Sequence, residues 1–530
     1  MEKHFNVTGI CIPKIHYMVN LESRLKEIRK LIEHGEYFTI NRARQYGKTT
    51  TLACLKKMLS DDYVVISISF EGMGREAFSN ENTFCKYFLR LLYNSLKYGR
   101  QASIPGENIE ECKEKAEDTS SEMSFWKLSD FISDLCVASY KPLVLVVDEV
   151  DQAGNYDIFL NFLGLLRNKY LDRIEIPTFQ SVILAGVYDI KNLKLKIRKE
   201  MEHQYNSPWN IAADFNVDMS FSSRDIEGML SDYENVRHTG MDIREISQLI
   251  YDYTSGYPYL VSRICKLADE NVSQKQGFSA ETAWSREGIM DAVGILLLRP
   301  NTLFDDMIKH LAEYPELNTI FSNILFNGIE YTFNAYNTAM NIGVMFGFIK
   351  ESNGIAVIAN RIFEMHLYQY YLSEEMIKAD NPYFPTGSTS QFTKNGCLDM
   401  DLVMEKFLEY YTDIYHDADQ KFVEKQGRKL FLLYLRPIIN GTGNFYVEAQ
   451  TRDETRTDIV VNYLREQHII ELKIWHGAKY NEKGEQQLIR YLNLYHLDKG
   501  YLLTFNFNKK KQPGKKEITI QGKRILEIIV

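Results

Sequence analysis

The chain has 530 residues, which at about 150 residues per domain predicts three or four domains and excludes a peptide or a single small module. With 45% hydrophobic and 25% charged residues, 30 Gly and only 12 Pro, the composition is that of a globular protein and not of a disordered or fibrous one. A formal net charge of -9 excludes a global attraction to phosphate backbones or anionic membranes, so nucleic-acid binding would need a local basic patch.

Cysteine usage and apolar segments indicate a cytoplasmic protein. The seven cysteines include no Cys-x-x-Cys pair, so neither a zinc site nor a disulfide framework is readable, and a reducing compartment fits best. The longest apolar runs, such as 143–147 and 295–298, are far shorter than the roughly 20 residues that span a bilayer. Residues 1–13 lack a signal-peptide pattern, and we expect no membrane association.

Strand and helix patterns alternate in the first part of the chain, which predicts a parallel α/β sheet. Residues 37–41 have the pattern of a short buried strand and 48–59 that of a helix, with a polar loop between them. Further strand patterns, separated by helical stretches long enough for right-handed crossovers, lie at 63–70, 143–147, 182–187 and 215–221.

The rest of the chain is divided by its periodicity and by one turn-rich stretch. Residues 222 to about 293 are helical throughout, and 302–372 combine helices with a strand pair around 351–354, which resembles a winged helix. Residues 380–393 hold Asn-Pro and Phe-Pro-Thr-Gly-Ser and predict a linker. We therefore expect an α/β domain, a helical lid, a winged-helix-like domain, a linker and a second α/β domain at 1–221, 222–300, 301–379, 380–397 and 398–530.

The loop between the first strand and the first helix of the sheet is a candidate phosphate-binding loop. It reads Arg-Ala-Arg-Gln-Tyr-Gly-Lys-Thr over 42–49 and lacks the first glycine of G-x-x-x-x-G-K-[ST]. Gly47 would let the backbone approach phosphates, Lys48 would reach the β- and γ-phosphates, and Thr49 would offer its hydroxyl to Mg²⁺. Taken alone, the loop has an alternative explanation, a chance Gly-Lys-Thr at a helix start.

A second element of a nucleotide site follows about a hundred residues later. The apolar strand 142–147 runs into Asp148 and Glu149, and carboxylates at the carboxyl end of a parallel strand lie where α/β sheets bind ligands. We expect Asp148 to hold Mg²⁺ and Glu149 to polarise the attacking water; the alternative is that the acids only cap the strand. The strand 182–187 ends in Tyr188-Asp189, where related ATPases carry a γ-phosphate sensor.

These motifs resemble those of bacterial AAA-ATPase-like proteins, whose phosphate loop is arginine-rich before Phe/Tyr-Gly-Lys-Ser/Thr. The likeness covers about residues 5–300 and includes Val146-Val147-Asp148-Glu149, Leu184-Ala185-Gly186-Val187 and Gly256-Tyr257-Pro258. The resemblance implies that the domain binds and hydrolyses ATP with Mg²⁺. The cofactor-binding residues that it implies, besides Asp148, are Arg42, Arg44, Gly47, Lys48, Thr49, Thr50, Pro258, which would pack on the adenine, and Arg263, which would sense phosphate.

A second constellation lies near the C-terminus. Residues 458–464 and 468–475 have the patterns of adjacent strands, and Glu471 and Lys473, two residues apart, share a face. A site that cuts phosphodiesters needs carboxylates that hold Mg²⁺ or Mn²⁺ and a lysine that orients water or stabilises developing charge. The following helix carries Gln487 and Tyr491 one turn apart. The alternative is an exposed edge strand.

These residues resemble the PD-(D/E)XK nuclease superfamily, in the branch with a Gln-x-x-x-Tyr helix, over about residues 400–507 and in the order α-β-β-β-α-β. Thr457 stands where the family has a proline. The resemblance implies that Asp458 and Glu471 are metal ligands, Lys473 the catalytic lysine and Glu424 an auxiliary ligand. It also implies that Gln487 and Tyr491 support the site.

The register of the two strands is a test of this likeness. A three-residue turn at 465–467 would pair Asp458 with Ile474 and point Asp458 away from the site. The site requires Asp458 opposite Lys473, and therefore a two- or four-residue turn or a bulge. After the last predicted strand, Lys509, Lys510, Lys511, Lys515 and Lys516 form either a phosphate-contacting patch or a solvated loop.

The sequence therefore predicts a cytoplasmic bacterial protein in which an ATP-binding switch regulates a C-terminal metal-dependent DNA nuclease, with defence against foreign DNA as a purpose inferred from the architecture alone. The expected partner is nucleic acid, DNA rather than RNA, and a homo-oligomer is left open. One alternative is a nucleotide-dependent regulatory or scaffold protein whose nuclease-like domain is inert and binds nucleic acid or a protein. Another is a DNA translocase, which would need a ring or tandem motor domains.

Overall fold

The computed structural model describes residues 2–99, 103–187, 208–327, 329–378, 392–394, 397–414, 424–439, 443–446, 459–463, 466–475, 478–507 and 512–530. The chain forms two compact units. The first comprises Met1–Tyr251, Ser255–Ser285 and Asn341–Phe348, and the second comprises Asp252–Thr254, Arg286–Met340 and Ile349–Val530. Each unit is described by itself below.

The first unit is built on a parallel sheet of four strands in the order β3-β6-β5-β4. These are β3 (Phe38–Asn41), β6 (Ser181–Gly186), β5 (Leu143–Asp148) and β4 (Val64–Ser69). Every residue of β5 and β6 is buried, as expected for central strands covered on both faces. The predicted parallel α/β fold is thereby confirmed.

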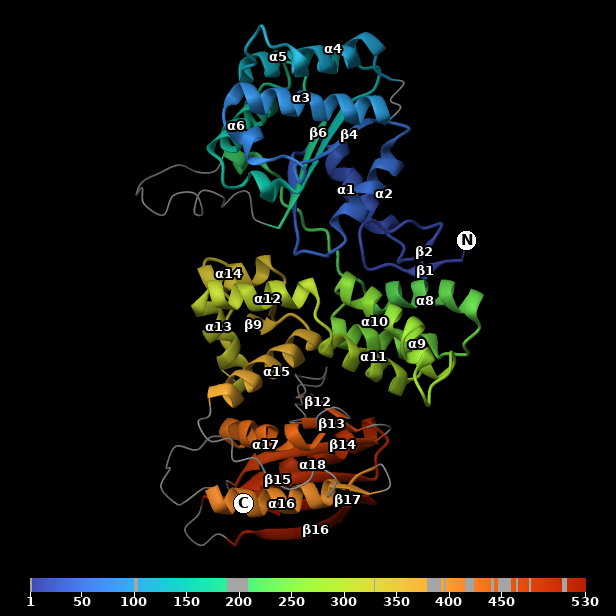
Figure 1. Cartoon of the computed structure of the whole chain (residues 1–530), viewed down its shortest axis with the longest axis vertical. Helices are drawn as coiled ribbons and strands as arrows, with labels where there is room; N and C mark the ends of the chain where they lie inside the picture. The colour runs from blue at the N-terminus through green and yellow to red at the C-terminus, as the bar shows by residue number, and fades with distance from the viewer. Residues whose placement is uncertain are drawn as a thin grey trace. The chain divides into compact units, whose positions relative to one another are not determined.

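Helices cover both faces of this sheet, as Figure 1 shows. One apolar cluster lies beneath α1 (Glu22–Glu33) and α2 (Lys48–Leu59), and α2 has the bounds that the sequence predicts. The other lies beneath α3 (Glu81–Tyr98), α5 (Phe125–Ala138) and α6 (Asp157–Leu171), with α4 (Gly106–Glu117) against α3. A short pair of parallel strands, β1 (His4–Phe5) and β2 (His16–Tyr17), precedes them.

The predicted strand at 215–221 is wrong: the segment is extended but forms no strand, and a single bridge, between Phe38 and Ala213, joins its start to the sheet. Its side chains nevertheless alternate, because Val217 and Met219 are buried in the cluster under α1 and α2. Hydrogen bonds from two arginines replace some of those that a neighbouring strand would donate. The guanidinium of Arg42 donates to Val217 O, and that of Arg24 donates to Asp218 O and Ser220 O.

Three helices follow the extended segment within the first unit. They are α8 (Ser223–Arg237), α9 (Ile243–Thr254), whose last residues belong to the second unit, and α10 (Pro258–Glu270). A capping box on Ser222 and Asp225 begins α8. Gly256, at a φ of 74°, joins α9 to α10 so closely to Phe221 that a Cβ there would lie 1.9 Å from Phe221 O. Only glycine fits this junction.

The second unit begins with helices and a small antiparallel sheet. The helices are α11 (Arg286–Leu298), α12 (Thr302–Glu313), α13 (Pro315–Ser322) and α15 (Arg361–Lys378), while α14 (Thr338–Met345) is divided between the units. The sheet has the order β7-β9-β8, from β7 (Tyr331–Thr332), β8 (Ile349–Ser352) and β9 (Ile355–Ile358). The predicted strand pair around 351–354 is confirmed as the β8–β9 hairpin, whose turn is Asn353-Gly354, both at positive φ.

The second unit also contains a mixed sheet of six strands in the order β12-β13-β14-β15-β17-β16. The strands are β12 (Gly443–Tyr446), β13 (Ile459–Tyr463), β14 (Glu466–Ile474), β15 (Lys499–Phe505), β16 (Gly514–Ile520) and β17 (Lys523–Ile529). On one face, α16 (Met400–Ile414) meets Tyr501 through Asp401, and α17 (Glu424–Ile439) meets Phe505 at Gly427. On the other face, α18 (Ala478–Leu494) meets Gly500 and Lys473.

One prediction about this sheet needs correction, and one open alternative is decided. The basic stretch does not follow the last strand: Lys515 and Lys516 lie in β16, β17 comes after them, and Lys509, Lys510 and Lys511 lie outside the described residues. Of the turn lengths left open between β13 and β14, the structure has the two-residue one, because Tyr463 pairs with Glu466 and only residues 464 and 465 lie between the strands.

Candidate functional site

The loop that precedes α2 has the geometry of a phosphate-binding loop. Gly47 is the N-cap of α2 at a φ of 79°, a left-handed conformation that glycine adopts without steric cost, and Gln45 is also at positive φ. The loop therefore turns directly into the N-terminus of α2. The unpaired backbone N–H groups and the positive end of the helix dipole make such a terminus an anion site.

The side chain of Lys48 is held by the loop itself. Its Nζ donates to Arg42 O at 2.9 Å and to Ala43 O at 3.0 Å, and the residue is 6% exposed. Burial lowers the pKa of Lys48, whereas the nearby carboxylates, Glu149 first, raise it. The ammonium thus rests on neutral carbonyl oxygens, which an incoming phosphate oxygen can replace at little cost.

The two acids that follow β5 lie beside this loop. Asp148 Oδ2 accepts a hydrogen bond of 3.0 Å from the Thr49 hydroxyl, and these two oxygens are hard ligands of the kind that Mg²⁺ prefers. Glu149 has a left-handed φ of 53°. Burial, and next the charge of Asp148, raises the pKa of Glu149. Asp148 is thus hydrogen-bonded to a hydroxyl, whereas Glu149 lines the space next to the loop.

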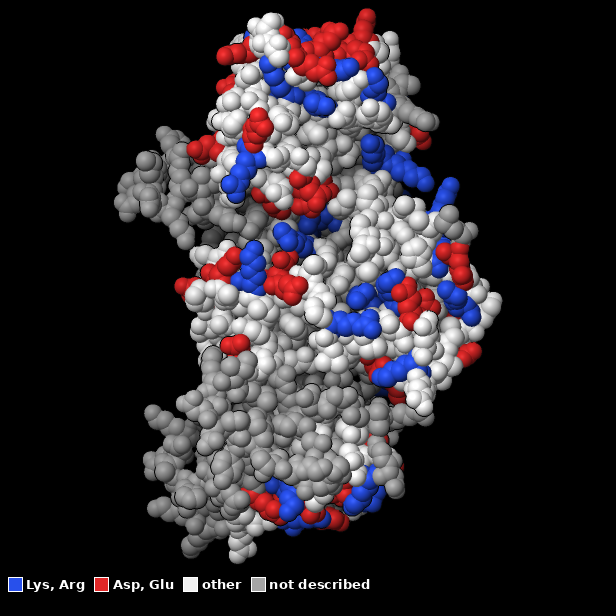
Figure 2. All heavy atoms as spheres, viewed as in Figure 1, with Lys and Arg blue, Asp and Glu red and all other residues white. Residues whose placement is uncertain are grey.

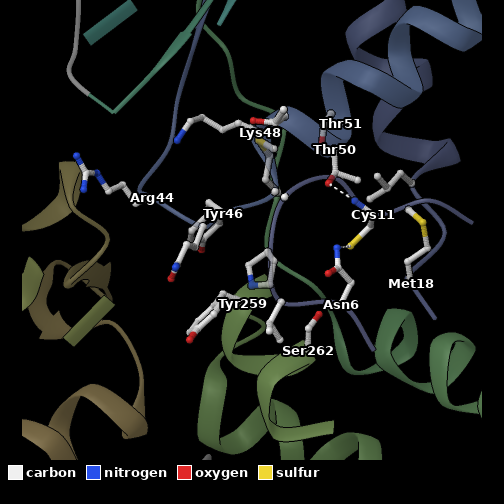
Figure 3. Close-up of a pocket in the computed structure, with 18 of the residues that line it drawn as sticks. Asn6, Cys11, Met18, Arg44, Tyr46, Lys48, Thr50, Thr51, Tyr259 and Ser262 are labelled. Carbon is white, nitrogen blue, oxygen red and sulfur yellow. Dashed lines mark hydrogen bonds between the residues drawn. The ribbon is translucent and has the colours of Figure 1, made fainter. Parts of the chain in front are cut away.

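That space is a cavity of about 560 Å³. Figure 3 shows residues from the start of α2 on one side, namely Lys48, Thr50 and Thr51, and the α10 residues Tyr259 and Ser262 on the other. The N-terminal residues Asn6 and Cys11 lie between them. The volume falls within the range of about 300–1,000 Å³ that small-molecule sites occupy. Of the residues expected here, the lining includes Arg44, Gly47, Lys48, Thr49, Thr50, Glu149 and Pro258.

Arg42, Asp148 and Arg263 are not among the lining residues. Arg42 donates to Asn41 O and Val217 O and lies 5.3 Å from the ring of Phe215, so its contacts support the extended segment. Arg263 lies on α10, whose residues Pro258, Tyr259 and Ser262 do reach the cavity. Tyr188 and Asp189, the expected sensor, lie outside the described residues.

Sequence reasoning missed the contribution of the N-terminal segment to the cavity. Asn6, Cys11 and Met18 line it, and the backbone N–H of Cys11 donates to the Thr50 hydroxyl at 3.1 Å. Thr50 therefore anchors this segment as well as lining the cavity. No periodicity or motif in residues 6–18 indicates this role, because the contact depends on the position of α2 in the folded chain.

In the six-stranded sheet, the acid and the lysine of the second constellation are in contact. Lys473 Nζ lies 2.9 Å from Glu471 Oε1, and the side chains of Glu471 and Lys473 are 0% and 14% exposed. β14 lies between β13 and β15, so the alternative of an exposed edge strand is wrong. On α18, which covers this face, Gln487 is half-buried and Tyr491 is buried.

Two expected ligands fall outside what the structure describes. Asp458 lies outside the described residues, and Glu424 begins α17 with a side chain that is not described. The pairs Val460↔Ile469 and Asn462↔Gln467 put the even-numbered positions of β13 on the face of the odd-numbered positions of β14. Glu471 and Lys473 are odd-numbered, so the hairpin has the parity that the site requires.

Within the described ranges, no group of three or more His, Cys, Asp and Glu side chains is arranged to hold a metal ion. Among the helices in those ranges, none combines the length and the apolar character that crossing a membrane requires.

Comparison with known proteins identifies both parts of the chain. The family model of an AAA-like domain matches residues 15–374, and that of the PD-(D/E)XK nuclease superfamily matches residues 443–518. No curated protein matches the chain.

Similar solved structures are ATPases and their relatives. The Walker-type ATPase PABY2304 of Pyrococcus abyssi is 13% identical, with 68% of this chain and 99% of that chain covered and a TM-score of 0.47. The Holliday junction branch migration motor RuvB of Thermotoga maritima is 12% identical, with 64% and 92% covered and a TM-score of 0.32. By its family matches, the chain belongs to the AAA-like domain family and carries a C-terminal domain of the PD-(D/E)XK nuclease superfamily.

Proposed function

We propose that the chain binds and hydrolyses ATP and uses the nucleotide to regulate a C-terminal nuclease that cuts DNA with Mg²⁺ or Mn²⁺. The observation that carries the nuclease part is the pair of the buried Glu471 and the partly buried Lys473 on the α18 face of the six-stranded sheet. Taking a carboxylate and its cationic partner out of water costs free energy, and hydrophobic residues in their place are often at least as stable, so the pair is consistent with a functional use. Membership of the nuclease superfamily supplies the use.

In the ATPase part, each residue has a separate task. The amides that follow Gly47 would bind the phosphates, and Lys48 would move from the carbonyls of Arg42 and Ala43 to phosphate oxygens. Thr49 and Asp148 would hold Mg²⁺, which would neutralise negative charge on the phosphates. Glu149 would accept the proton of the attacking water.

In the nuclease part, Glu471 and Asp458 would hold the metal ion, and Lys473 would stabilise charge on the scissile phosphate. A bound divalent ion supplies a Lewis acid and lowers the pKa of water. Carboxylate oxygens are suitable ligands for Mg²⁺ or Mn²⁺. DNA is the expected substrate. Because the net charge of the chain is -9, the residues that attract DNA must form a local basic patch. In Figure 2, the described Lys and Arg side chains on the drawn face are interspersed with Asp and Glu.

The test is cleavage of linear, circular and single-stranded DNA, and of RNA, by the purified chain with Mg²⁺ or Mn²⁺. Glu471→Ala is expected to abolish cleavage and to leave ATP binding intact. Glu517→Ala is the matched control, because Glu517 lies in the same sheet on β16 with a side chain that is 76% exposed. Cleavage that persists in Glu471→Ala, or fails equally in both variants, contradicts the nuclease assignment.

Regulation is tested by varying ATP at constant free metal, since ATP chelates Mg²⁺. To change cleavage tenfold, ATP must favour one state of the chain over another by only about 1.4 kcal/mol. We expect wild type to respond to ATP and Lys48→Ala not to respond. Identical curves for the two proteins would show two independent activities on one chain.

One observation favours the alternative of a regulatory or scaffold protein with an inert nuclease-like domain. Glu471 already has a direct cationic partner in Lys473 at 2.9 Å, and an acid neutralised in this way has less to offer a metal ion. Calorimetry with Mn²⁺ distinguishes the two functions. Manganese binding that is lost in Glu471→Ala supports the nuclease, whereas DNA binding without manganese binding supports the alternative.

A further inference from the structure

Glu527 is a second buried carboxylate in the nuclease sheet that the proposed chemistry does not use. Among the glutamates whose burial the structure describes, Glu471 and Glu527 are the two that are buried, at 0% and 1% exposed. Glu527 lies on β17, two strands away from Glu471. A carboxylate in the interior of a sheet loses its hydration, so it must be compensated by hydrogen bonds or charge within the protein.

The strand register places Glu527 on the same face as the Glu471–Lys473 pair. Glu471 pairs with Leu502, and Leu502 pairs with Glu527, so these three form one row across the sheet. Lys473 pairs with Thr504 in the next row of the same face. Helix α18 covers this face: a Cβ on Gly484 would lie 3.0 Å from Lys473 Cγ, and a Cβ on Gly500 would meet Leu488.

Thr504 joins the two rows. It is 0% exposed, and its hydroxyl donates to Glu527 Oε1 at 2.8 Å. A hydroxyl has one proton, and this one is directed at Glu527, so toward any other neighbour Thr504 offers only lone pairs. The neighbour of Thr504 on β14 is Lys473, whose ammonium is a donor with three protons. Because the Thr504 hydroxyl donates to Glu527, its oxygen remains an acceptor, which is what the Lys473 ammonium requires.

We propose that Glu527, acting through the Thr504 hydroxyl, is a positioning residue that keeps the ammonium of Lys473 over Glu471. The expected change in cleavage rate rests on the proposed nuclease function, whereas the expected change in the position of Lys473 does not. Glu527 fixes the rotamer and the proton of Thr504, and Thr504 closes the side of the Lys473 ammonium that faces β15. The two buried glutamates are then the two ends of one polar row, Glu471–Lys473–Thr504–Glu527, under α18.

The test uses Thr504→Val, which removes the hydroxyl with little change in volume, and Thr504→Ser, which keeps it. Tyr501→Phe is the matched control, because Tyr501 is on the same strand but the opposite face, where its hydroxyl donates to Asp401 Oδ1 at 2.9 Å. In crystal structures of the full chain, we expect the distance between Lys473 Nζ and Glu471 to exceed hydrogen-bonding range in Thr504→Val. It should stay at the wild-type distance in Thr504→Ser and Tyr501→Phe. An unchanged pair in Thr504→Val overturns the proposal.

The second measurement is steady-state cleavage of DNA with Mn²⁺. Loss of an outer partner of a metal site costs about tenfold to a hundredfold in activity. We expect Thr504→Val to lower kcat in that range at unchanged KM, with recovery in Thr504→Ser and no effect in Tyr501→Phe. Equal kcat in wild type and Thr504→Val overturns the proposal. If wild type cuts no nucleic acid, the proposed function fails, and the crystallographic distances still decide the positioning role.

Discussion

Lys48, which is buried, and Lys473, which is partly buried, both lie near carboxylates, but the two regions hold them differently. In the first unit, Lys48 donates to two backbone carbonyls beside an open cavity, and Asp148 has the Thr49 hydroxyl as its partner. In the six-stranded sheet, Lys473 contacts Glu471 directly and no solvent reaches the acid. A lysine on neutral acceptors is ready for an anionic ligand, whereas a lysine on a carboxylate is already neutralised. The lysine of the nucleotide site is therefore available to an anionic ligand, whereas the lysine of the nuclease site already neutralises the charge of Glu471.

The largest expected effect is that of Lys48→Ala on ATP binding. The substitution removes the cation that the loop presents to the phosphates, so binding measured by calorimetry should be lost. Lys57→Ala, an exposed lysine on the same helix, is the control and should bind ATP as wild type does. Equal ATP affinity for Lys48→Ala and wild type would remove the contrast between the two lysines.

Glu149→Gln should separate binding from turnover. The amide keeps the size of the side chain but cannot accept a proton from water, so hydrolysis should fall by about 10²- to 10⁴-fold while ATP affinity is retained. Phosphate release at saturating ATP is the measurement. Unchanged turnover would assign the base to another residue and would leave Glu149 as a capping acid after β5.

Gly256→Ala should destabilise the first unit and spare the second. A Cβ at this position would lie 1.9 Å from Phe221 O, and the positive φ adds strain, so we expect a loss of more than about 3 kcal/mol in the free energy of unfolding. Gly240→Ala has the same sign of φ but nothing within 4 Å, so it should cost about 1 kcal/mol. Urea unfolding of both variants checks the difference; equal costs would mean that the contact with Phe221 is relieved by a small shift.

The smallest effect is a pH dependence in the second unit. Burial lowers the pKa of His366 to about 4, and its ring stacks on Phe304 at 4.0 Å. Because an unfolded histidine titrates near 6.5, the unfolded state gains a proton that the folded state refuses as the pH falls from about 6.5 toward about 4. Stability is therefore retained above this window and lost within it, by about 1 kcal/mol between about pH 7.5 and pH 5.5. His366→Phe keeps the stacking and should lose less stability over that pH interval than wild type; an equal loss would assign it to other groups.

The sequence predicted the elements whose patterns are local. The loop and helix around Gly47 and Lys48 and the acids after β5 combine a motif with an apolar strand, and both survive in the folded chain with nearly the predicted bounds. The acid and lysine on one face of β14 needed only the alternation of a strand. Local patterns of this kind follow from the side-chain periodicities of helices and strands, which do not depend on distant partners.

The failures concern partners that are distant in sequence. The segment 215–221 alternates as a strand does, but Arg24 and Arg42 satisfy its carbonyls, and no pattern within the segment shows this. The cavity wall formed by residues between Asn6 and Met18 likewise depends on where this segment lies relative to α2. The length of the turn between β13 and β14 stayed open, because two and three residues are equally compatible with the apolar pattern on either side.

The arginine-held segment also has a consequence for self-association. β3 is one of the two edge strands of the parallel sheet, and an edge strand offers unpaired backbone groups that can pair with a second molecule. Here Ala213 bridges to β3, and in the chain that follows the carbonyls of Val217, Asp218 and Ser220 accept hydrogen bonds from guanidinium groups. The segment shields this border without extending the ladder, and these three acceptors are already occupied. Arg24 and Arg42 thus hold a segment at the β3 edge that covers this edge without forming a further strand.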